Sequence, residues 1–357
     1  MRHLLYLLFA ASILSCNTTQ KEVTEFFPAD NDEFLYSGRY SDSENGVELI
    51  NSAASVKTTV FGDSVSIAVV SGNDQHQYIS IEIGEEYKGR FRIKSDTLKF
   101  ALPEANQGTM LTIYKDTEAS NGSVLFKGLA AEKIESVERE ERPAIEFIGN
   151  SITCGMGADT REIACEDGEW YDQHNAYLAY GSRVARALNV DYVLNCVSGM
   201  GMYRNWNDED MPVMADVYSS MRLDGNGEEM VDSSSKAPDI VSIALGTNDL
   251  SLGDGSKERT AFDQEVFVQR YISFLEMIFS KYPETKIALI SSPMIGKNEN
   301  DLLITSLKRV KEHFETKDIS VFEFEKMEAG GCTSHPDIED HRKMAEQLVP
   351  FFRGLLN

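Results

Sequence analysis

The sequence predicts two domains of different class, an all-β sandwich followed by an α/β domain built on a doubly wound parallel sheet. Three observations support this division of the 357 residues. From about residue 34 to residue 134, apolar residues recur two apart. After residue 143, near-continuously apolar segments alternate with amphipathic ones. Between the two regions lies a charged segment ending in a proline, EKIESVEREERP, which we interpret as the domain junction.

The N-terminus predicts export and lipidation. Residues 4–14 are apolar apart from Ser12, which is too short for a membrane span and typical of a secretory signal. The following sequence, ILSC, resembles a bacterial lipoprotein box with cleavage before Cys16 and lipid on its thiol; the alternative is an ordinary signal peptide with a chance cysteine. We therefore expect a signal peptide over 1–15, a polar tether over 16–30, and an exported bacterial lipoprotein, periplasm-facing or on the cell surface of the outer membrane. The lipid would be its only contact with a membrane.

The sandwich is predicted from short alternating segments separated by Gly, Asn, Asp or Pro. Its clearest strands are expected at 64–70, 78–84, 89–95, 97–103 and 110–116. No helical stretch interrupts them. We therefore expect an all-β domain over 31–135.

The α/β domain is expected over 143–357. Apolar segments predict strands at 144–149, 190–199, 239–249, 285–293 and 319–325. Amphipathic segments predict helices at 175–189, 263–283, 302–315 and 337–356. Sheets of this kind carry their sites at the carboxyl ends of the strands, so polar residues just past those ends are the candidates.

Composition excludes some classes of function. The formal net charge is −24, whereas a nucleic-acid-binding protein needs a basic surface for phosphates, so we expect no nucleic-acid partner. No cysteine or histidine group has zinc spacing, so we expect no metal and no other cofactor. Cys154, Cys165, Cys196 and Cys332 remain in an oxidising compartment, where three full disulfide pairings, or free buried thiols, are possible.

Ser151 and His335 are the candidate nucleophile and base. Ser151 follows the strand at 144–149 on a tight turn, where a serine is either a nucleophile or only a turn residue and helix cap. His335 follows the fifth strand and precedes Pro336, which suits the first turn of a helix. His341 already lies within that helix and is a weaker candidate. The other histidines of the mature chain are less suited by position: His76, His174 and His313.

Two further strand ends supply candidate oxyanion donors. Gly199 lies in NCVSGMG, where glycine lets backbone N–H groups approach a ligand closely, and Gly201 is a less suited substitute. Asn248 lies in GTND and carries a side-chain amide. Each signal is weak alone, but all four residues occur in order, each after its own strand. This arrangement favours acyl transfer through a serine.

These motifs resemble a known superfamily. GNSIT, SGMG, GTND and HP…H resemble blocks I, II, III and V of the SGNH hydrolases, whose sheet is flavodoxin-like. GNSITCGMG, SGMGMYRNW and GCTSHP are more similar to carbohydrate esterase family two, the acetylxylan esterases, and YKDTEASNGSVLFKGL to the closing segment of that family's N-terminal jelly roll. The resemblance implies that Ser151 is the nucleophile and His335 the base. It also implies an oxyanion hole made of the N–H groups of Ser151 and Gly199 and the Asn248 side chain.

The chain departs from the common SGNH pattern at two positions. Asn150 stands where block I has Asp, which should matter little. Cys332 stands three residues before His335, where the superfamily has an Asp that orients the base. Family two uses a Ser–His dyad with a backbone carbonyl in that role, so Thr333, Ser334 or a neighbouring carbonyl could hold His335. A carboxylate from elsewhere, Asp249 or Asp337, is the alternative.

Aromatic side chains near the predicted site suit a sugar substrate. Loops after the first two strands of the α/β domain contain Trp170, Tyr171, Tyr203 and Trp206. Most could merely pack the loops together; Trp206 and Tyr203, followed by Trp170, are the preferred substrate contacts. We expect removal of O-acetyl groups from an acetylated polysaccharide or oligosaccharide of the xylan or mannan type. The alternatives are an esterase for another acylated glycan or small ester, and a catalytically silent carbohydrate-binding lipoprotein.

Overall fold

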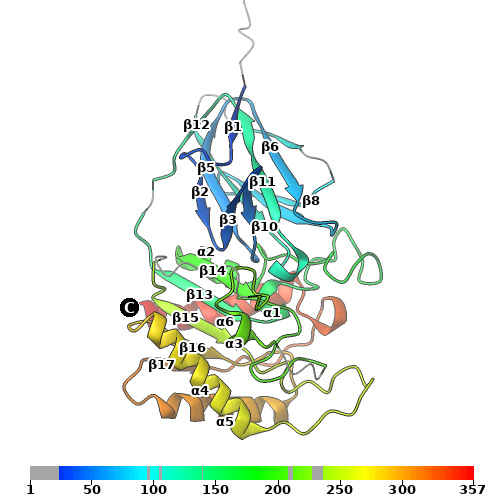
Figure 1. The fold of residues 1–357 in the computed structure, drawn as a ribbon, viewed down its shortest axis with the longest axis vertical. Coiled ribbons are helices and arrows are strands. Elements are labelled where there is room, and N and C mark those ends of the chain that lie inside the picture. The colour runs from blue at the N-terminus through cyan, green and yellow to red at the C-terminus, as the bar shows by residue number, and fades with distance from the viewer. Residues whose placement is uncertain (1–23, 95–96, 104–106, 139, 208–211, 227–235) are drawn as a thin grey trace, which may run out of the picture.

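The computed structural model describes residues 24–357 except 95–96, 104–106, 139, 208–211 and 227–235. The predicted signal peptide and Cys16 lie outside the described residues. Figure 1 shows the all-β domain above and the α/β domain below, so the predicted fold class is confirmed.

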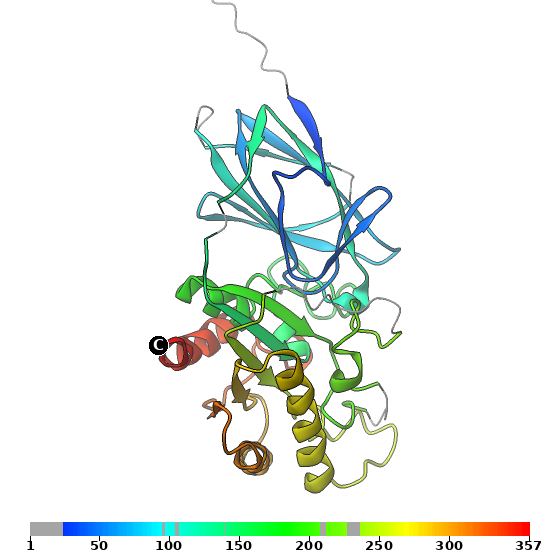
Figure 2. The same ribbon diagram turned by 60° about the vertical axis from the view of Figure 1, so that its left-hand side comes forward.

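The N-terminal domain is a sandwich of two six-stranded antiparallel sheets (Figure 2). Alternate residues face its core; in β6, Val65, Ile67 and Val69 are fully buried. One sheet runs β3 (Tyr40–Ser43), β4 (Gly46–Leu49), β11 (Val124–Ala131), β6 (Ser64–Ser71), β9 (Thr97–Ala101), with β1 (Glu25–Pro28) paired to β11. The other runs β12 (Lys133–Glu135), β5 (Ser55–Phe61), β10 (Thr109–Lys115), β7 (Tyr78–Ile83), β8 (Glu86–Arg92), with β2 (Leu35–Ser37) paired to β5.

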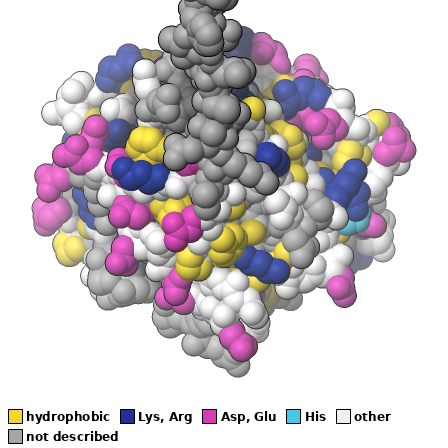
Figure 3. Space-filling model, turned by 90° about the horizontal axis from the view of Figure 1, so that it is seen from above, with side chains coloured by type: hydrophobic (Ala, Val, Ile, Leu, Met, Phe, Trp, Pro, Cys, Tyr) yellow, Lys and Arg dark blue, Asp and Glu magenta, His cyan; other side chains and the backbone are white. Residues whose placement is uncertain are grey.

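The sandwich begins earlier than its sequence suggests. β1 pairs with β11 from Glu25 to Pro28, so these residues belong to the sheet and not to the predicted tether. β1 is only four residues long and lacks the alternation of apolar and polar residues that marks a strand in the sequence. It forms by pairing with β11, which local sequence does not reveal. Seen from above, the described side chains at this end of the molecule mix acidic, basic and apolar groups (Figure 3).

The α/β domain contains a five-stranded parallel sheet. Its order is β14 (Asp191–Cys196), β13 (Ala144–Gly149), β15 (Ile240–Ala244), β16 (Lys286–Ile290), β17 (Ile319–Phe322). Strand order reverses beside β13, which places the end of β13 at the switch point of the sheet. One apolar core joins the sheet to α4 (Gln264–Lys281) and α5 (Lys297–His313), and another joins it to α2 (Tyr180–Leu188) and α6 (Ile338–Leu356). No helix among the described residues is both long and apolar enough to cross a bilayer.

One predicted helix is shorter than expected. The helix expected over 175–189 begins only at Tyr180. The reason lies in the other domain: the Ala176 N–H donates to the Asp116 carbonyl (3.3 Å), and the Tyr177 N–H donates to the Asp116 carboxylate (3.1 Å). Residues 176 and 177 therefore bind the sandwich instead of starting the helix.

The two domains meet through buried polar contacts. Arg39, between β2 and β3, donates to the Asn195 side chain (2.6 Å) and to the Tyr218 carbonyl (2.8 Å). The Asn51 amide donates to the Leu194 carbonyl (2.7 Å). These side chains are almost fully buried, so the domains form one packed unit.

Candidate active site

Ser151 lies on the turn between β13 and the short helix α1 (Ser151–Cys154). The Asn150 side chain caps this helix by accepting the Ile152 N–H (3.1 Å). Asp and Asn cap helices about equally well, which explains why Asn150 can replace the Asp of block I. As the first residue of the helix, Ser151 has an N–H without an intrahelical acceptor. The turn therefore presents both a hydroxyl and a backbone donor at the carboxyl end of the sheet.

His335 contacts the Ser151 hydroxyl. Its Nε2 lies 2.7 Å from Ser151 Oγ, and its Nδ1 lies 3.0 Å from the Thr333 carbonyl oxygen. The Thr333 hydroxyl donates to the Cys332 carbonyl (2.8 Å). This network assigns the proton to Nδ1, which donates to Thr333, and leaves Nε2 to accept the Ser151 proton.

A turn with unusual backbone geometry aims the Thr333 carbonyl. Thr333 and Ser334 have φ angles of 50° and 60°, in the left-handed region that β-branched residues rarely adopt. Strain of this kind is held where the surrounding structure fixes it, typically at functional sites. Among the alternatives for holding His335, the structure has the Thr333 carbonyl, with the Thr333 hydroxyl as a second neighbour 3.2 Å from Nδ1.

Neither candidate carboxylate is hydrogen-bonded to His335. Asp249 accepts the backbone N–H groups of residues 202–204 (2.8–3.2 Å). Asp337 caps α6 by accepting the N–H groups of residues 339 and 340. Burial lowers the pKa of His335 below its usual range, although hydrogen bonds to the Thr333 and Cys332 backbone partly oppose this. The candidate base is therefore neutral at neutral pH.

His341 is part of the core. It is fully buried, its ring stacks on Tyr180, and its Nδ1 accepts the Tyr180 N–H (3.2 Å). Burial lowers its pKa to about 3, so it remains uncharged. Its contacts fix the start of α2 and do not reach Ser151.

The Gly199 amide is available to a ligand and the Gly201 amide is not. Gly199 has a φ of 79°, and among the described residues no group accepts a hydrogen bond from its N–H. The Gly201 N–H donates to the Asn205 side chain (3.2 Å). The Asn248 amide donates one proton to the Met200 carbonyl (2.8 Å), which leaves its second N–H.

Two disulfides connect the parts of the site. Cys154–Cys196 joins α1 to the end of β14, and Cys165–Cys332 joins the loop after α1 to the turn η2 (Cys332–Ser334) that carries Thr333. The sequence left this pairing open. The bonds tie the serine turn to the strand before Gly199, and the histidine turn to a neighbouring loop.

The aromatic candidates divide into exposed and packed rings. Trp206 is 41% exposed, and its ring lies against Gly199, where a Cβ atom would be 2.7 Å from the indole. Trp170 is 47% exposed and lies edge-on to Tyr171. Tyr203 packs against two phenylalanines, and its hydroxyl accepts the Asp263 N–H (3.0 Å), so packing accounts for its position. Tyr171 is buried.

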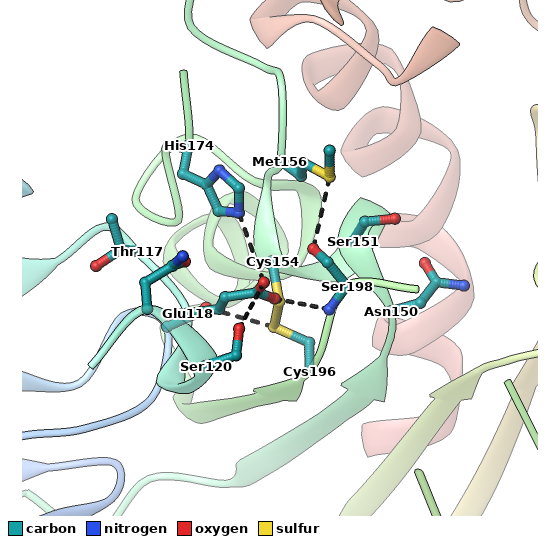
Figure 4. A network of polar contacts seen from close by, with 12 residues as sticks. Thr117, Glu118, Ser120, Asn150, Ser151, Cys154, Met156, His174, Cys196 and Ser198 are labelled. Carbon is teal, nitrogen blue, oxygen red and sulfur yellow. Dashed lines mark hydrogen bonds and ion pairs between the residues drawn. A yellow bond between two sulfur atoms is a disulfide. The ribbon is translucent and has the colours of Figure 1, made fainter. Parts of the chain in front are cut away.

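Two residues that the sequence analysis did not select lie beside this site. Glu118, from the sandwich, accepts the Ser198 N–H at 2.7 Å and is fully buried (Figure 4). His174 is also fully buried, with Nε2 4.0 Å from the Glu118 carboxylate. The signal for Glu118 in the sequence was the charged run KDTE, which closes the strand expected at 110–116.

A metal-binding cluster is not present among the described residues, where no three His, Cys, Asp or Glu side chains converge suitably. The Ser151 hydroxyl meets the His335 imidazole, while Gly199 and Asn248 follow β14 and β15, the two strands paired with β13. Together these residues can transfer a proton, attack a carbonyl carbon and stabilise an oxyanion.

Comparison with known proteins agrees with this chemistry. Residues 147–315 match the GDSL-like lipase/acylhydrolase family, and residues 36–138 match the carbohydrate esterase 2 N-terminal domain. The fold and the matches point to one class: the chain is similar to carboxylic ester hydrolases. Within that class, its relatives and structural neighbours are family two carbohydrate esterases, which it resembles across both domains.

Individual relatives cover most of the chain. A cellulase/esterase, CelE, of Acetivibrio thermocellus is 29% identical over 92% of this chain. The match covers only 40% of the length of CelE. An acetylxylan esterase / glucomannan deacetylase of Cellvibrio japonicus is 23% identical over 96% of the chain and 95% of its own. A family two carbohydrate esterase from Clostridium thermocellum, solved with cellohexaose, has a TM-score of 0.79 and 26% identity, covering 90% of this chain and 99% of its own.

Proposed function

We propose that this protein removes O-acetyl groups from a polysaccharide of the xylan or mannan type through an acetyl-serine intermediate. The observation that carries the proposal is the 2.7 Å contact between Ser151 Oγ and His335 Nε2, with His335 Nδ1 held by the Thr333 carbonyl. In this proposal Ser151 is the nucleophile, His335 is the general base, and a backbone carbonyl replaces the usual orienting carboxylate.

The reaction proceeds in two halves. Ser151 Oγ attacks the acetyl carbonyl carbon while its proton passes to His335 Nε2. The carbonyl oxygen becomes an oxyanion that accepts hydrogen bonds from the N–H groups of Ser151 and Gly199 and from the Asn248 side chain. The ester C–O bond then breaks, and His335 returns the proton to the departing sugar hydroxyl. In the second half, water loses a proton to Nε2 and attacks the carbonyl carbon of the acetyl-serine. The bond between that carbon and Ser151 Oγ then breaks, His335 returns the proton to Oγ, and acetic acid leaves as acetate after losing its proton to solvent.

The choice of a glycan substrate rests on the relatives and on two exposed rings. One relative is named an acetylxylan esterase / glucomannan deacetylase, and a neighbouring structure contains cellohexaose. In this chain Trp206 lies against Gly199, so a sugar ring stacked on its exposed face would hold an acetyl group beside the oxyanion donors. Trp170 is the second candidate platform.

Export as a lipoprotein anchored through Cys16 is part of the proposal. It would place the enzyme at the cell surface or facing the periplasm, with the lipid as its only membrane contact. The test is mass spectrometry of the N-terminal peptide from membranes of the expressing cell. A lipidated Cys16 supports the anchor, whereas an unmodified N-terminus in a soluble fraction would contradict it.

The test of the proposed activity is acetate release from acetylated xylan, acetylated glucomannan and acetylated pectin. We expect release from xylan or glucomannan with wild-type protein and none with Ser151→Ala. Activity confined to pectin or to small aryl esters would contradict the assignment of substrate.

A further inference from the structure

Glu118 brings a carboxylate from the sandwich into the wall of the candidate active site. It follows β10 and precedes the short turn η1 (Ala119–Asn121), where the sandwich meets the α/β domain. Lys115 holds the backbone at Glu118. Its side chain is fully buried, and its Nζ donates to the carbonyls of Thr117 (2.7 Å) and Glu118 (2.9 Å). The backbone that carries the Glu118 carboxylate is therefore held in place.

The contacts of this carboxylate are specific. One oxygen accepts the Ser198 N–H (2.7 Å) and the other accepts the Ser120 hydroxyl (2.9 Å). The first oxygen also lies 3.0 Å from the sulfur of Cys154, in the disulfide that joins α1 to β14. Figure 4 shows Glu118 beside the disulfide of Cys154 and Cys196, with a dashed line from its carboxylate to Ser198.

Ser198 is the residue before Gly199. Its N–H belongs to the peptide unit just ahead of the one whose N–H is the proposed oxyanion donor. A hydrogen bond that fixes the first unit limits the rotation that would turn the Gly199 N–H away, and Gly199, at a φ of 79°, has no side chain to restrain it. Displacements of about 1 Å can reduce turnover roughly 100-fold, so this restraint matters for the rate.

Stability does not account for a carboxylate at this position. Burial raises the pKa of Glu118 above its usual range even though Ser120 and Ser198 donate to it. The neighbouring His174 supplies no compensating cation, because burial lowers the pKa of its imidazole well below the usual value. The buried Lys115 ammonium favours the charged carboxylate but offsets its desolvation only in part, since the pKa of Glu118 stays raised. An apolar side chain would dock the domains at lower desolvation cost, so the carboxylate is explained by the amide that it holds.

We infer that Glu118 is a positioning residue for the esterase reaction, and that the sandwich thereby contributes a working part of the oxyanion hole. The inference rests on the proposed function. Glu118 touches neither the substrate nor the reacting atoms; it acts through Ser198 on Gly199.

Glu118→Gln is the first test, and Asp116→Asn is its matched control. Asp116 is two residues away, equally buried, and also accepts a backbone N–H of the α/β domain, but that N–H belongs to Tyr177 and not to the oxyanion loop. Both changes replace a carboxylate with an amide of the same shape, which removes the charge but keeps one acceptor oxygen. Glu118→Met, of similar length and without an acceptor oxygen, removes the hydrogen bond from the Ser198 N–H and is the decisive variant of this test. Kinetics on 4-nitrophenyl acetate use the full chain, with kcat normalised to active sites titrated by a serine-reactive sulfonyl fluoride.

We expect Glu118→Met to lower normalised kcat by about 10- to 100-fold, less than the loss of a whole oxyanion donor, with little change in KM. Glu118→Gln, which keeps one acceptor oxygen, should lower it less. The acid limb of the pH profile should not move, because His335 is untouched. Asp116→Asn should keep its normalised kcat. If Glu118→Met does not fold, Glu118→Asp, which withdraws the carboxylate by one methylene, should show the same selective loss of kcat.

The inference is overturned if folded Glu118→Met protein retains the normalised kcat of Asp116→Asn, or if its loss disappears on active-site titration. A wild-type protein without esterase activity would overturn the proposed function together with this inference. An active wild type with unaffected Glu118 variants would overturn the inference alone.

Discussion

At the scale of single residues, the candidate base is held by a dipole instead of a charge. His335 Nδ1 donates to the Thr333 carbonyl (3.0 Å), and the two nearest candidate carboxylates are engaged with backbone N–H groups elsewhere. A carboxylate would raise the pKa of the imidazole, whereas burial lowers it here. This difference has a measurable consequence.

The pH profile of kcat/KM should report a base of low pKa. Because neutral His335 is the active form and its pKa is lowered, activity should be complete at neutral pH and fall only as the pH drops through a value below about 6.5. The measurement is kcat/KM for 4-nitrophenyl acetate across the acid range. An acid limb at or above pH 7 would indicate a carboxylate partner and contradict the dyad.

The two histidines near the C-terminus should separate catalysis from stability. His335→Ala should lower kcat by about 10²- to 10⁴-fold with little change in melting temperature, because the side chain is the proposed general base. His341→Ala should instead lower the melting temperature, because it removes a buried ring that accepts the Tyr180 N–H, and should cost far less activity. The reverse ranking of kcat would move the base to His341.

At the scale of elements, two carboxylates that sequence spacing leaves as possible partners of His335 have structural roles. Asp337 caps α6, and Asp249 gathers the backbone N–H groups that shape the loop beyond Gly201. Both residues act on the backbone, so their replacement should change loop and helix stability before it changes chemistry.

Asp337→Asn should keep most of its activity, since Asn is a comparable helix cap. Asp249→Asn should be less stable, because one amide oxygen replaces a carboxylate that accepts three N–H groups. Activity and melting temperature are measured together, with Asp263→Asn, the cap of α4, as a control for the loss of charge. If either variant folds normally yet is as inactive as His335→Ala, a carboxylate does orient the base.

The Cys165–Cys332 disulfide should stabilise the histidine turn. The bond closes a separation of 167 residues and attaches η2 to a loop of the same domain. We expect the Cys165→Ser/Cys332→Ser double variant to lose about 2–5 kcal/mol of unfolding free energy, as removal of native disulfides generally does. Denaturant unfolding measures this loss, and thiol counting of wild-type protein is the control. Free thiols at these positions in the oxidised protein would contradict the pairing.

At the scale of the whole molecule, the candidate site residues that the sequence could indicate are those placed directly after a strand. Ser151, Gly199, Asn248 and His335 each follow their own strand, and a parallel sheet brings such ends together. Sequence reasoning did not find Glu118, because its role depends on how one domain docks on the other. It also overextended the helix at 175–189, since nothing local shows that Asp116 takes the N–H groups of residues 176 and 177. The disulfide pairing likewise depends on tertiary contacts.

The central claim is that Ser151 is the nucleophile of an ester hydrolase. The most direct measurement compares wild-type and Ser151→Ala protein, both folded by circular dichroism, for kcat/KM on 4-nitrophenyl acetate and for acetate released from acetylated xylan and glucomannan. The account predicts that wild-type protein is active on the ester and on at least one of these polysaccharides, and that Ser151→Ala falls to the background of the uncatalysed reaction on all of them. A folded Ser151→Ala protein that retains most of the wild-type rate would contradict it.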